Sequence, residues 1–154
     1  MRVATLPPFV EVVKIDRLCR RSDSDLRTAA RELAIDHLTR RREADAIEEF
    51  RVRFEADIQW LRESNDLGLF HQYAFATLRQ LGANAELAST FCGWLGGLDV
   101  SAEAFGALAG GAKSLQFKLA RVAAGRNADL RDAFAAVTDH WRVAFSGLAS
   151  ELLS

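Results

Sequence analysis

Apolar positions recur along most of the chain at the spacing of amphipathic helices. The clearest stripe lies near the end of the sequence, where every third or fourth residue is apolar: Leu130, Phe134, Val137, Trp141, Phe145, Leu148 and Leu152. A stripe with this spacing occupies one face of an α-helix, which then packs against other elements. Related stripes occur upstream, and together they predict six helices at about 24–42, 47–65, 67–81, 87–97, 101–125 and 127–152.

Capping residues support several of these helix ends. Ser22 to Asp25 offer N-cap side chains for the first helix, and Ser101 offers one for the fifth. Gly82 is expected to end the third helix, because glycine readily adopts the left-handed conformation that closes a helix. The connections are short, so neighbouring helices should run antiparallel. Since no alternating strand pattern follows residue 20, the predicted fold class is all-α, a single helical bundle.

The first 21 residues follow a different pattern. Pro7 and Pro8 precede a run rich in β-branched residues, from Val10 to Ile15, which favours an extended chain. A lone strand has no partner in a helical chain, so we expect this segment to pack on the bundle or to belong to a part that is missing. The predicted organisation is a leader or linker over 1–21 and a helical bundle domain over 22–154.

Composition and charge narrow the class of protein. The chain has 154 residues, 49% of them hydrophobic and 27% charged, which is typical of one globular domain. A net charge of −1 gives no general reason to expect nucleic acid or a membrane surface as a partner. The longest uncharged run, Leu87 to Leu98, is shorter than the ~20 residues that span a bilayer. Two cysteines cannot form a disulfide framework, and we expect a cytoplasmic protein.

Motifs for catalysis or metal binding are weak. The glycine-rich stretch 106–114 has one residue too many before Lys113 for a phosphate loop, and no strand precedes it. The histidines lack the spacing of zinc ligands, and His37 lies on an apolar stripe that predicts a hydrogen-bonded core histidine. Cys92 lies in an apolar helix and is expected to be inert. We therefore expect no catalytic residue, no metal site and no cofactor on this chain.

The predicted fifth helix carries an aromatic residue on the side away from its inward face. At 100° per residue, Phe117 lies nearly opposite the apolar stripe of this helix. Lys113 and Arg121 flank it one turn away on either side, with Gln116 and Lys118 beside it. A large apolar side chain among cations suggests docking to another domain or to an anionic partner. The alternative is that the helix is central and that Phe117 packs within the bundle.

Three segments carry a family resemblance. They read LPPFVEVVK at 6–14, YAFATLRQLGA at 73–83 followed by ELA at 86–88, and GAKSLQFKLAR at 111–121. In this order they resemble the bacterial DUF1839 family, which has no known function, and specifically the C-terminal half of its longer members. The resemblance runs over nearly the whole chain, and the last two segments are its more specific part.

This resemblance implies a function. Genes of the family tend to lie near amino acid:carrier-protein ligases, and the N-terminal half of its members is similar to the papain-like acyltransferase domain of butirosin biosynthesis. The resemblance therefore implies that this chain is a non-catalytic helical domain that assists a papain-like aminoacyl or acyl transferase. The transferase would be an N-terminal domain or a partner chain, and the helical domain would assist it by binding a carrier protein or its cargo. Carrier proteins are acidic, so the expected contacts are the cations Lys113, Lys118, Arg121 and Arg79. The half expected to hold the catalytic cysteine is not in this sequence, and we expect either a truncation or a separately encoded half.

Two other functions stay open. A self-contained small enzyme could use a cavity in the bundle, with His71, Tyr73 and Arg79 as its polar lining. A purely structural role in oligomerisation is the second. The enzyme hypothesis requires that the side chains of His71, Tyr73 and Arg79 converge on one cavity.

Overall fold

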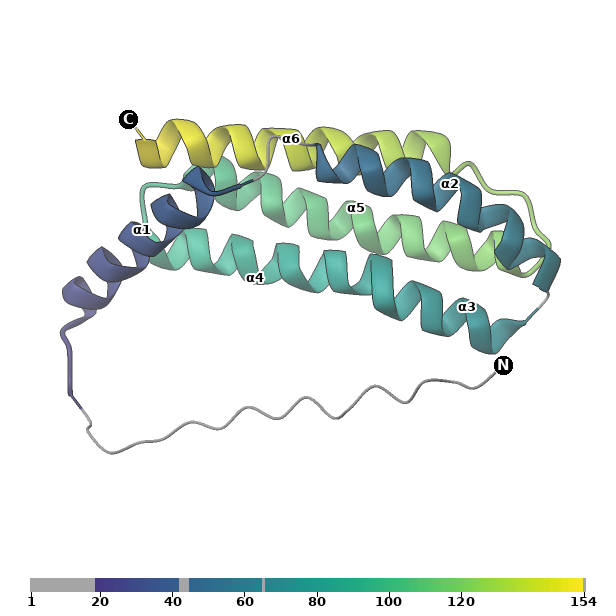
Figure 1. The fold of residues 1–154 in the computed structure, drawn as a ribbon, viewed down its shortest axis with the longest axis horizontal. Helices are drawn as coiled ribbons and strands as arrows, with labels where there is room; N and C mark the ends of the chain where they lie inside the picture. The colour runs from purple at the N-terminus through teal and green to yellow at the C-terminus, as the bar shows by residue number, and fades with distance from the viewer. Residues whose placement is uncertain (1–18, 42–44, 65, 154) are drawn as a thin grey trace.

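The computed structural model describes residues 19–41, 45–64 and 66–153, and these residues form an all-α fold, as predicted. Its elements are α1 (Asp23–Thr39), α2 (Ala46–Ser64), α3 (Leu67–Ala74), the π-helical turn η1 (Phe75–Arg79), α4 (Gln80–Leu95), α5 (Asp99–Ala123) and α6 (Arg131–Leu153). Because α3, η1 and α4 follow one another without a break, the described residues contain five helices rather than six (Figure 1). Most of the predicted extended leader lies outside the described residues.

The predicted third and fourth helices form one continuous helix, so the expected stop at Gly82 is wrong. Gly82 lies inside α4, and a Cβ added there would be 3.6 Å from the Cβ of Ala112 on α5. This glycine therefore allows two helices to approach closely instead of ending one. Upstream, buried Phe70, Ala74 and Leu78 are spaced by four residues, which overshoots a regular helical turn by about 40° per step. The π-helical turn η1 has more residues per turn than an α-helix, so it reduces this angular overshoot and keeps the three side chains on one face.

Several helices, α1 and α6 among them, begin at a side-chain cap that lies close by in the sequence. The N-cap predicted for α1 is confirmed, since Ser22 Oγ accepts a hydrogen bond from the backbone N–H of Asp25 (3.1 Å). α6 begins at Arg131 rather than at 127, because the Asp129 carboxylate accepts hydrogen bonds from the backbone N–H groups of Arg131 (2.9 Å) and Asp132 (3.3 Å). A carboxylate in this position satisfies backbone donors that have no partner within the helix.

The cap of α5 comes from a distant part of the chain. α5 begins at Asp99, so the prediction of Ser101 as its N-cap is wrong. The carboxylate of Glu151, on α6, accepts hydrogen bonds from the backbone N–H groups of Val100 (3.0 Å) and Ser101 (3.2 Å). Sequence analysis could not identify this cap, because the residue that provides it lies 50 positions away.

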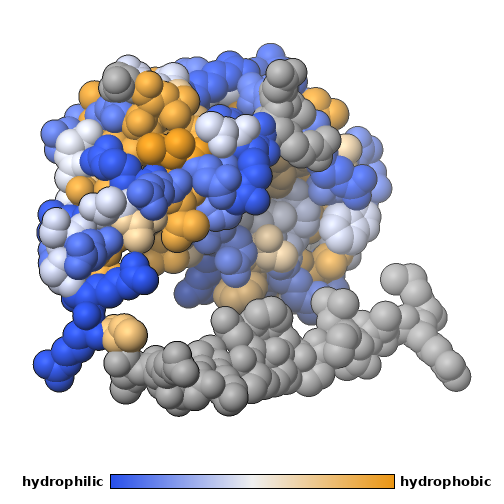
Figure 2. Space-filling model, turned by 60° about the vertical axis from the view of Figure 1, so that its left-hand side comes forward, coloured by the Kyte–Doolittle hydropathy of each residue, from blue (hydrophilic) through white to orange (hydrophobic). Residues whose placement is uncertain are grey.

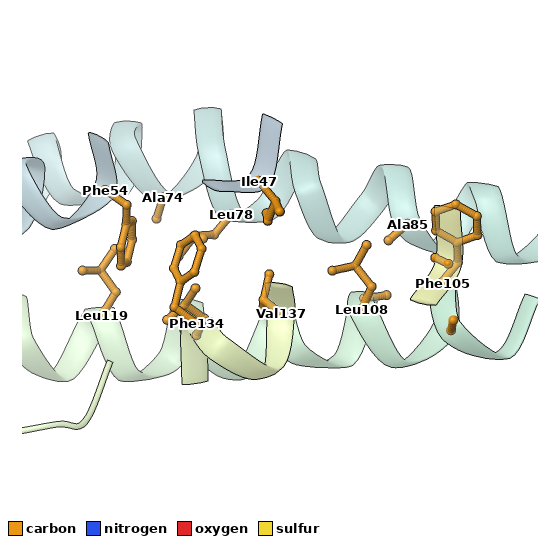
Figure 3. Close-up of a cluster of buried hydrophobic side chains, with 14 of the residues drawn as sticks. Ile47, Phe54, Ala74, Leu78, Ala85, Phe105, Leu108, Leu119, Phe134 and Val137 are labelled. Atoms are coloured by element: carbon orange, nitrogen blue, oxygen red, sulfur yellow. The ribbon is translucent and has the colours of Figure 1, made fainter. Parts of the chain in front are cut away.

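The core of the bundle lies along α5. Figure 1 shows α5 between α6 and the continuous α3–η1–α4 helix, with α2 beside it. Nine residues of α5 are buried, more than in any other helix of the described ranges. In the close-up of Figure 3, Phe54 of α2 and Phe134 of α6 approach Leu119 of α5, and the two ring centres are 5.1 Å apart. Each large side chain buried here contributes roughly 1.5–3 kcal/mol to folding.

α1 is the most peripheral of the described helices, since none of its residues is buried. The side chains that it packs against the bundle are Ala30, Ala34, Ile35 and Leu38. The apolar stripe predicted to hold His37 consists of Leu26, Ala30 and Leu33, and of these only Ala30 packs against the bundle. Leu26 is 46% exposed, Leu33 is 59% exposed, and His37 is exposed rather than a core histidine. Ala30 and Ala34 face the bundle together with Ile35 and Leu38, so the two leucines of the predicted stripe indicated the wrong face. A side-chain hydrogen bond also ties α1 to the bundle, from Arg31 to the backbone oxygen of Gly96 (2.8 Å).

Candidate functional site

The outward side of α5 presents an aromatic ring between two cations. Phe117 is 63% exposed, which excludes the alternative that it packs within the bundle. Lys113 and Arg121 are also exposed, one turn away on either side. Among the described residues, no carboxylate forms an ion pair with either cation. Gln116 and Lys118 lie beside Phe117 and are partly buried.

The packing of α4 against α5 determines which residues lie next to this ring. Gly82 of α4 faces Ala112 of α5, with 3.6 Å between an added Cβ and the Ala112 Cβ. Farther along α4, Ser89 Oγ donates a hydrogen bond to the backbone oxygen of Ala102 (2.8 Å). As residue numbers rise on α4 they fall on α5, so the two helices are antiparallel. Continuing this register backwards from Gly82 places η1 alongside residues 113–119 of α5.

The same register extends the exposed surface onto η1. Arg79 lies level with Lys113, and one turn earlier Phe75 lies level with Phe117. Both η1 residues are exposed, and the guanidinium carbon of Arg79 is 5.5 Å from the centre of the Phe75 ring. We call this set the cationic aromatic face, and its members are Phe75, Arg79, Lys113, Phe117 and Arg121.

The three residues predicted as the polar lining of an enzyme cavity do not converge. Tyr73 packs toward α2, where its ring centre is 6.5 Å from that of Phe54, and burial raises the pKa of its phenol above the ordinary value. His71 is exposed, and Arg79 belongs to the cationic aromatic face. None of the three lines the large groove of the bundle.

This groove is apolar and opens between α1, α4, α5 and α6. Its volume is about 740 Å³. The aromatic part of its lining consists of Phe91, Phe105, Trp141 and Phe145. Small side chains leave the space between these rings, and they include Ala34, Ala46, Ala85 and Ala88. Figure 2 views the end of the molecule where α1 lies and shows apolar surface, in orange, among hydrophilic residues.

Sequence analysis missed the groove, because its lining residues also fit ordinary stripe positions of packed helices. Alanines at facing positions of α1 and α4, opposite aromatic residues of α5 and α6, are the signal that could have indicated it. Large side chains opposite small ones usually interdigitate, but here they leave an open volume.

Among the described residues, the polar groups that line the groove are few, and none is a carboxylate. They include Arg41, His37 and Asn84. Arg41 lies over Phe145, with 3.9 Å between the guanidinium carbon and the ring centre, and the same carbon is 5.8 Å from the ring centre of Trp141. Trp141 Nε1 is buried and has no hydrogen-bond acceptor among the described residues. The groove therefore combines apolar walls with one arginine cation.

Cys92 also lines the groove, but its surroundings are not those of a nucleophile. Its thiol is buried, and this burial, together with the negative charge of Glu151, raises its pKa above the ordinary value. A thiol of raised pKa remains protonated near neutral pH and reacts slowly.

In the described ranges, no group of three or more His, Cys, Asp or Glu side chains could hold a metal ion. Nor does any of these helices combine the length and apolar character needed to cross a bilayer.

Comparison with known proteins places the bundle in a family. The family model of the DUF1839 C-terminal domain matches residues 23–150, which reach from the start of α1 almost to the end of α6. No curated protein and no solved structure matches the chain. The family match agrees with the resemblance carried by residues 73–88 and 111–121.

Proposed function

The chain belongs to the DUF1839 family through its C-terminal domain, and from this premise we propose that it is a non-catalytic binding domain for an acidic carrier protein. It assists a papain-like aminoacyl or acyl transferase, present as another domain or another chain, by holding the carrier protein or its cargo. The observation that carries the proposal is the cationic aromatic face, where Phe117 is 63% exposed between Lys113 and Arg121, which form no ion pair with any described residue.

The composition of this face fits the centre and the rim of a protein interface. Aromatic side chains and arginine are enriched where interfaces contribute most binding energy, and Phe75 and Phe117 offer two exposed rings. Arg79, Lys113 and Arg121 surround the rings with positive charge. Opposite charge on a partner speeds association and orients it, which favours an acidic partner over a neutral one.

Charge reversal at the edge of this face tests the proposal. The double variant Lys113→Glu, Arg121→Glu should bind an aminoacyl carrier protein at least about tenfold more weakly than the native chain, because two attractive contacts become repulsive. Binding is measured by calorimetry at low salt. The helical circular dichroism should not change, since both side chains are exposed.

The matched control carries the same change of charge elsewhere. Arg126→Glu with Arg131→Glu reverses two exposed arginines outside the cationic aromatic face and should keep most of the affinity. Equal affinity of the native chain and the Lys113, Arg121 variant would remove the proposal. A purely structural role is the second candidate, favoured by the same exposed rings. Light scattering detects it as a dimer of the native chain that dissociates when Phe117 becomes serine.

A further inference from the structure

We propose that the groove between α1, α4, α5 and α6 is a binding site for an amphipathic anion, a medium-chain acyl carboxylate, with the hydrocarbon in the groove and the carboxylate at Arg41. The site is separate from the cationic aromatic face. Leu108 lines the groove, whereas Phe117, nine residues later on α5, lies about half a turn around the helix. The proposal therefore does not depend on carrier-protein binding.

The size and length of the groove suit a small extended molecule. Its volume of about 740 Å³ lies within the range of about 300–1,000 Å³ that is usual for ligand sites. Along α4 its lining runs from Leu81 to Cys92, which corresponds to about 16 Å of helix. Because the groove is open to water, a hydrocarbon chain that binds there removes apolar side-chain surface from water, which favours binding.

The charge of the groove selects the head group of the ligand. Arg41 provides positive charge where the groove is lined by the rings of Trp141 and Phe145. Among the described residues, no aspartate or glutamate lines the groove, so the wall that they form carries no negative charge to oppose an anion. The planar guanidinium can donate two parallel hydrogen bonds to a carboxylate.

Calorimetric titration of the full chain with sodium decanoate tests the site, below the concentration at which the fatty acid aggregates. Octanoate, decanoate and dodecanoate should bind at one site, each added methylene tightening binding up to about fourfold. Decanol should bind at least about tenfold more weakly than decanoate, because it cannot pair with Arg41. Affinities that do not change with chain length, or that are equal for decanol and decanoate, would overturn the proposal.

Matched substitutions locate the site. Arg41→Gln should weaken decanoate binding at least about tenfold, whereas Arg40→Gln removes the same charge from a residue that pairs with Asp36 outside the groove and should not. Ala88→Phe fills the groove and should abolish binding, while Ala83→Phe adds the same ring at an exposed position of α4. Equal effects within either pair would overturn the assignment. If Ala88→Phe fails to fold, the comparison of Arg41→Gln with Arg40→Gln still tests whether decanoate binds in the groove.

A second copy of the chain could cover the groove instead. In that case the native chain is a dimer in solution, decanoate does not bind, and Ala88→Phe yields the monomer. Light scattering with and without decanoate separates the two outcomes, and the dimer result overturns the proposal. A monomer that binds decanoate supports it.

Discussion

At the scale of single residues, the carboxylate of Glu151 joins the end of α6 to the start of α5. It accepts hydrogen bonds from the backbone N–H groups of Val100 and Ser101 and from the Ser101 hydroxyl. Burial alone would raise the pKa of Glu151, but these hydrogen bonds favour the ionised form and together hold the pKa below its ordinary value. The positive end of the α5 dipole acts in the same direction.

Removing this charge should lower stability in a pH-dependent way. Glu151→Gln should reduce the free energy of unfolding by about 1 kcal/mol at pH 7, a usual effect of losing an N-terminal cap. Because the pKa of Glu151 is lower in the folded than in the unfolded state, its contribution is fully present above the unfolded pKa and is lost as the pH falls through the folded pKa. Urea unfolding of both proteins should therefore show a difference that shrinks below about pH 4.5.

The control for this experiment is Glu86→Gln, which removes an exposed carboxylate from α4. It should leave the free energy of unfolding almost unchanged across the same pH range. A Glu151→Gln difference that persists undiminished at pH 3 would show that ionisation of this side chain does not stabilise the start of α5.

At the scale of elements, two glycines inside helices have opposite surroundings. A Cβ added at Gly82 in α4 would be 3.6 Å from the nearest side chain, which is ordinary contact. A Cβ added at Gly147 in α6 would be 2.9 Å from Ser101 Oγ and 3.5 Å from the Ser101 backbone nitrogen. That hydroxyl is held by Glu151, so it cannot move away without losing a hydrogen bond.

Alanine at these two positions should therefore change stability in opposite directions. Gly82→Ala should raise the free energy of unfolding by roughly 0.5–1 kcal/mol, because alanine favours the helix and fits the space. Gly147→Ala has the same advantage in helix propensity but should lower the free energy of unfolding by about 1–3 kcal/mol through overpacking. Chemical denaturation of both variants measures this. A loss of stability in Gly82→Ala would mean that the α4–α5 contact is closer than it is described above.

The helices could be predicted well from the sequence where large apolar side chains form the buried face, and poorly where alanine and glycine do. α2 was predicted to within one residue, because its large apolar side chains, such as Phe54 and Leu61, coincide with the buried face. Alanine and glycine favour close packing without indicating a face. The orientation of α1 and the continuity through Gly82 were therefore predicted wrongly. The cap provided by Glu151 depends on tertiary packing, which no local pattern encodes.

The candidate sites divide in a similar way. The exposed position of Phe117 between Lys113 and Arg121 follows from helical spacing, and it could be predicted. Phe75 was missed, because its position level with Phe117 along the bundle depends on the register between α4 and α5. The groove was missed as well, since a cavity depends on how side chains from four helices fail to fill a volume, and composition carries little information about that.

At the scale of the whole molecule, burial is distributed unevenly around α5. Nine residues of α5 are buried but none of α1, which packs only through partly buried side chains and the Arg31 hydrogen bond. Local opening is easiest where few apolar contacts must be broken. The groove has α1 as one wall, so the helix that encloses it is also the one with the least buried surface.

Hydrogen exchange should show this difference directly. At pH 7, backbone amides in the middle of α1, over 29–35, should exchange at least about tenfold faster than those of α5 over 108–119, after correction for intrinsic rates. Mass spectrometry of pepsin fragments resolves the two segments. Equal protection would indicate that α1 opens only together with the whole bundle, in contrast to its shallow packing.

The hydrogen bonds from the first turn of α5 to Glu151 also bear on the order of events during synthesis. Translation delivers Ser101 to solvent well before Glu151, which follows 50 residues later. A nascent α5 therefore emerges with its first turn uncapped, and it stays so until α6 has been made and has folded back along it. A pause in translation between these two helices would lengthen the time for which the central helix of the bundle is exposed to chaperones and proteases.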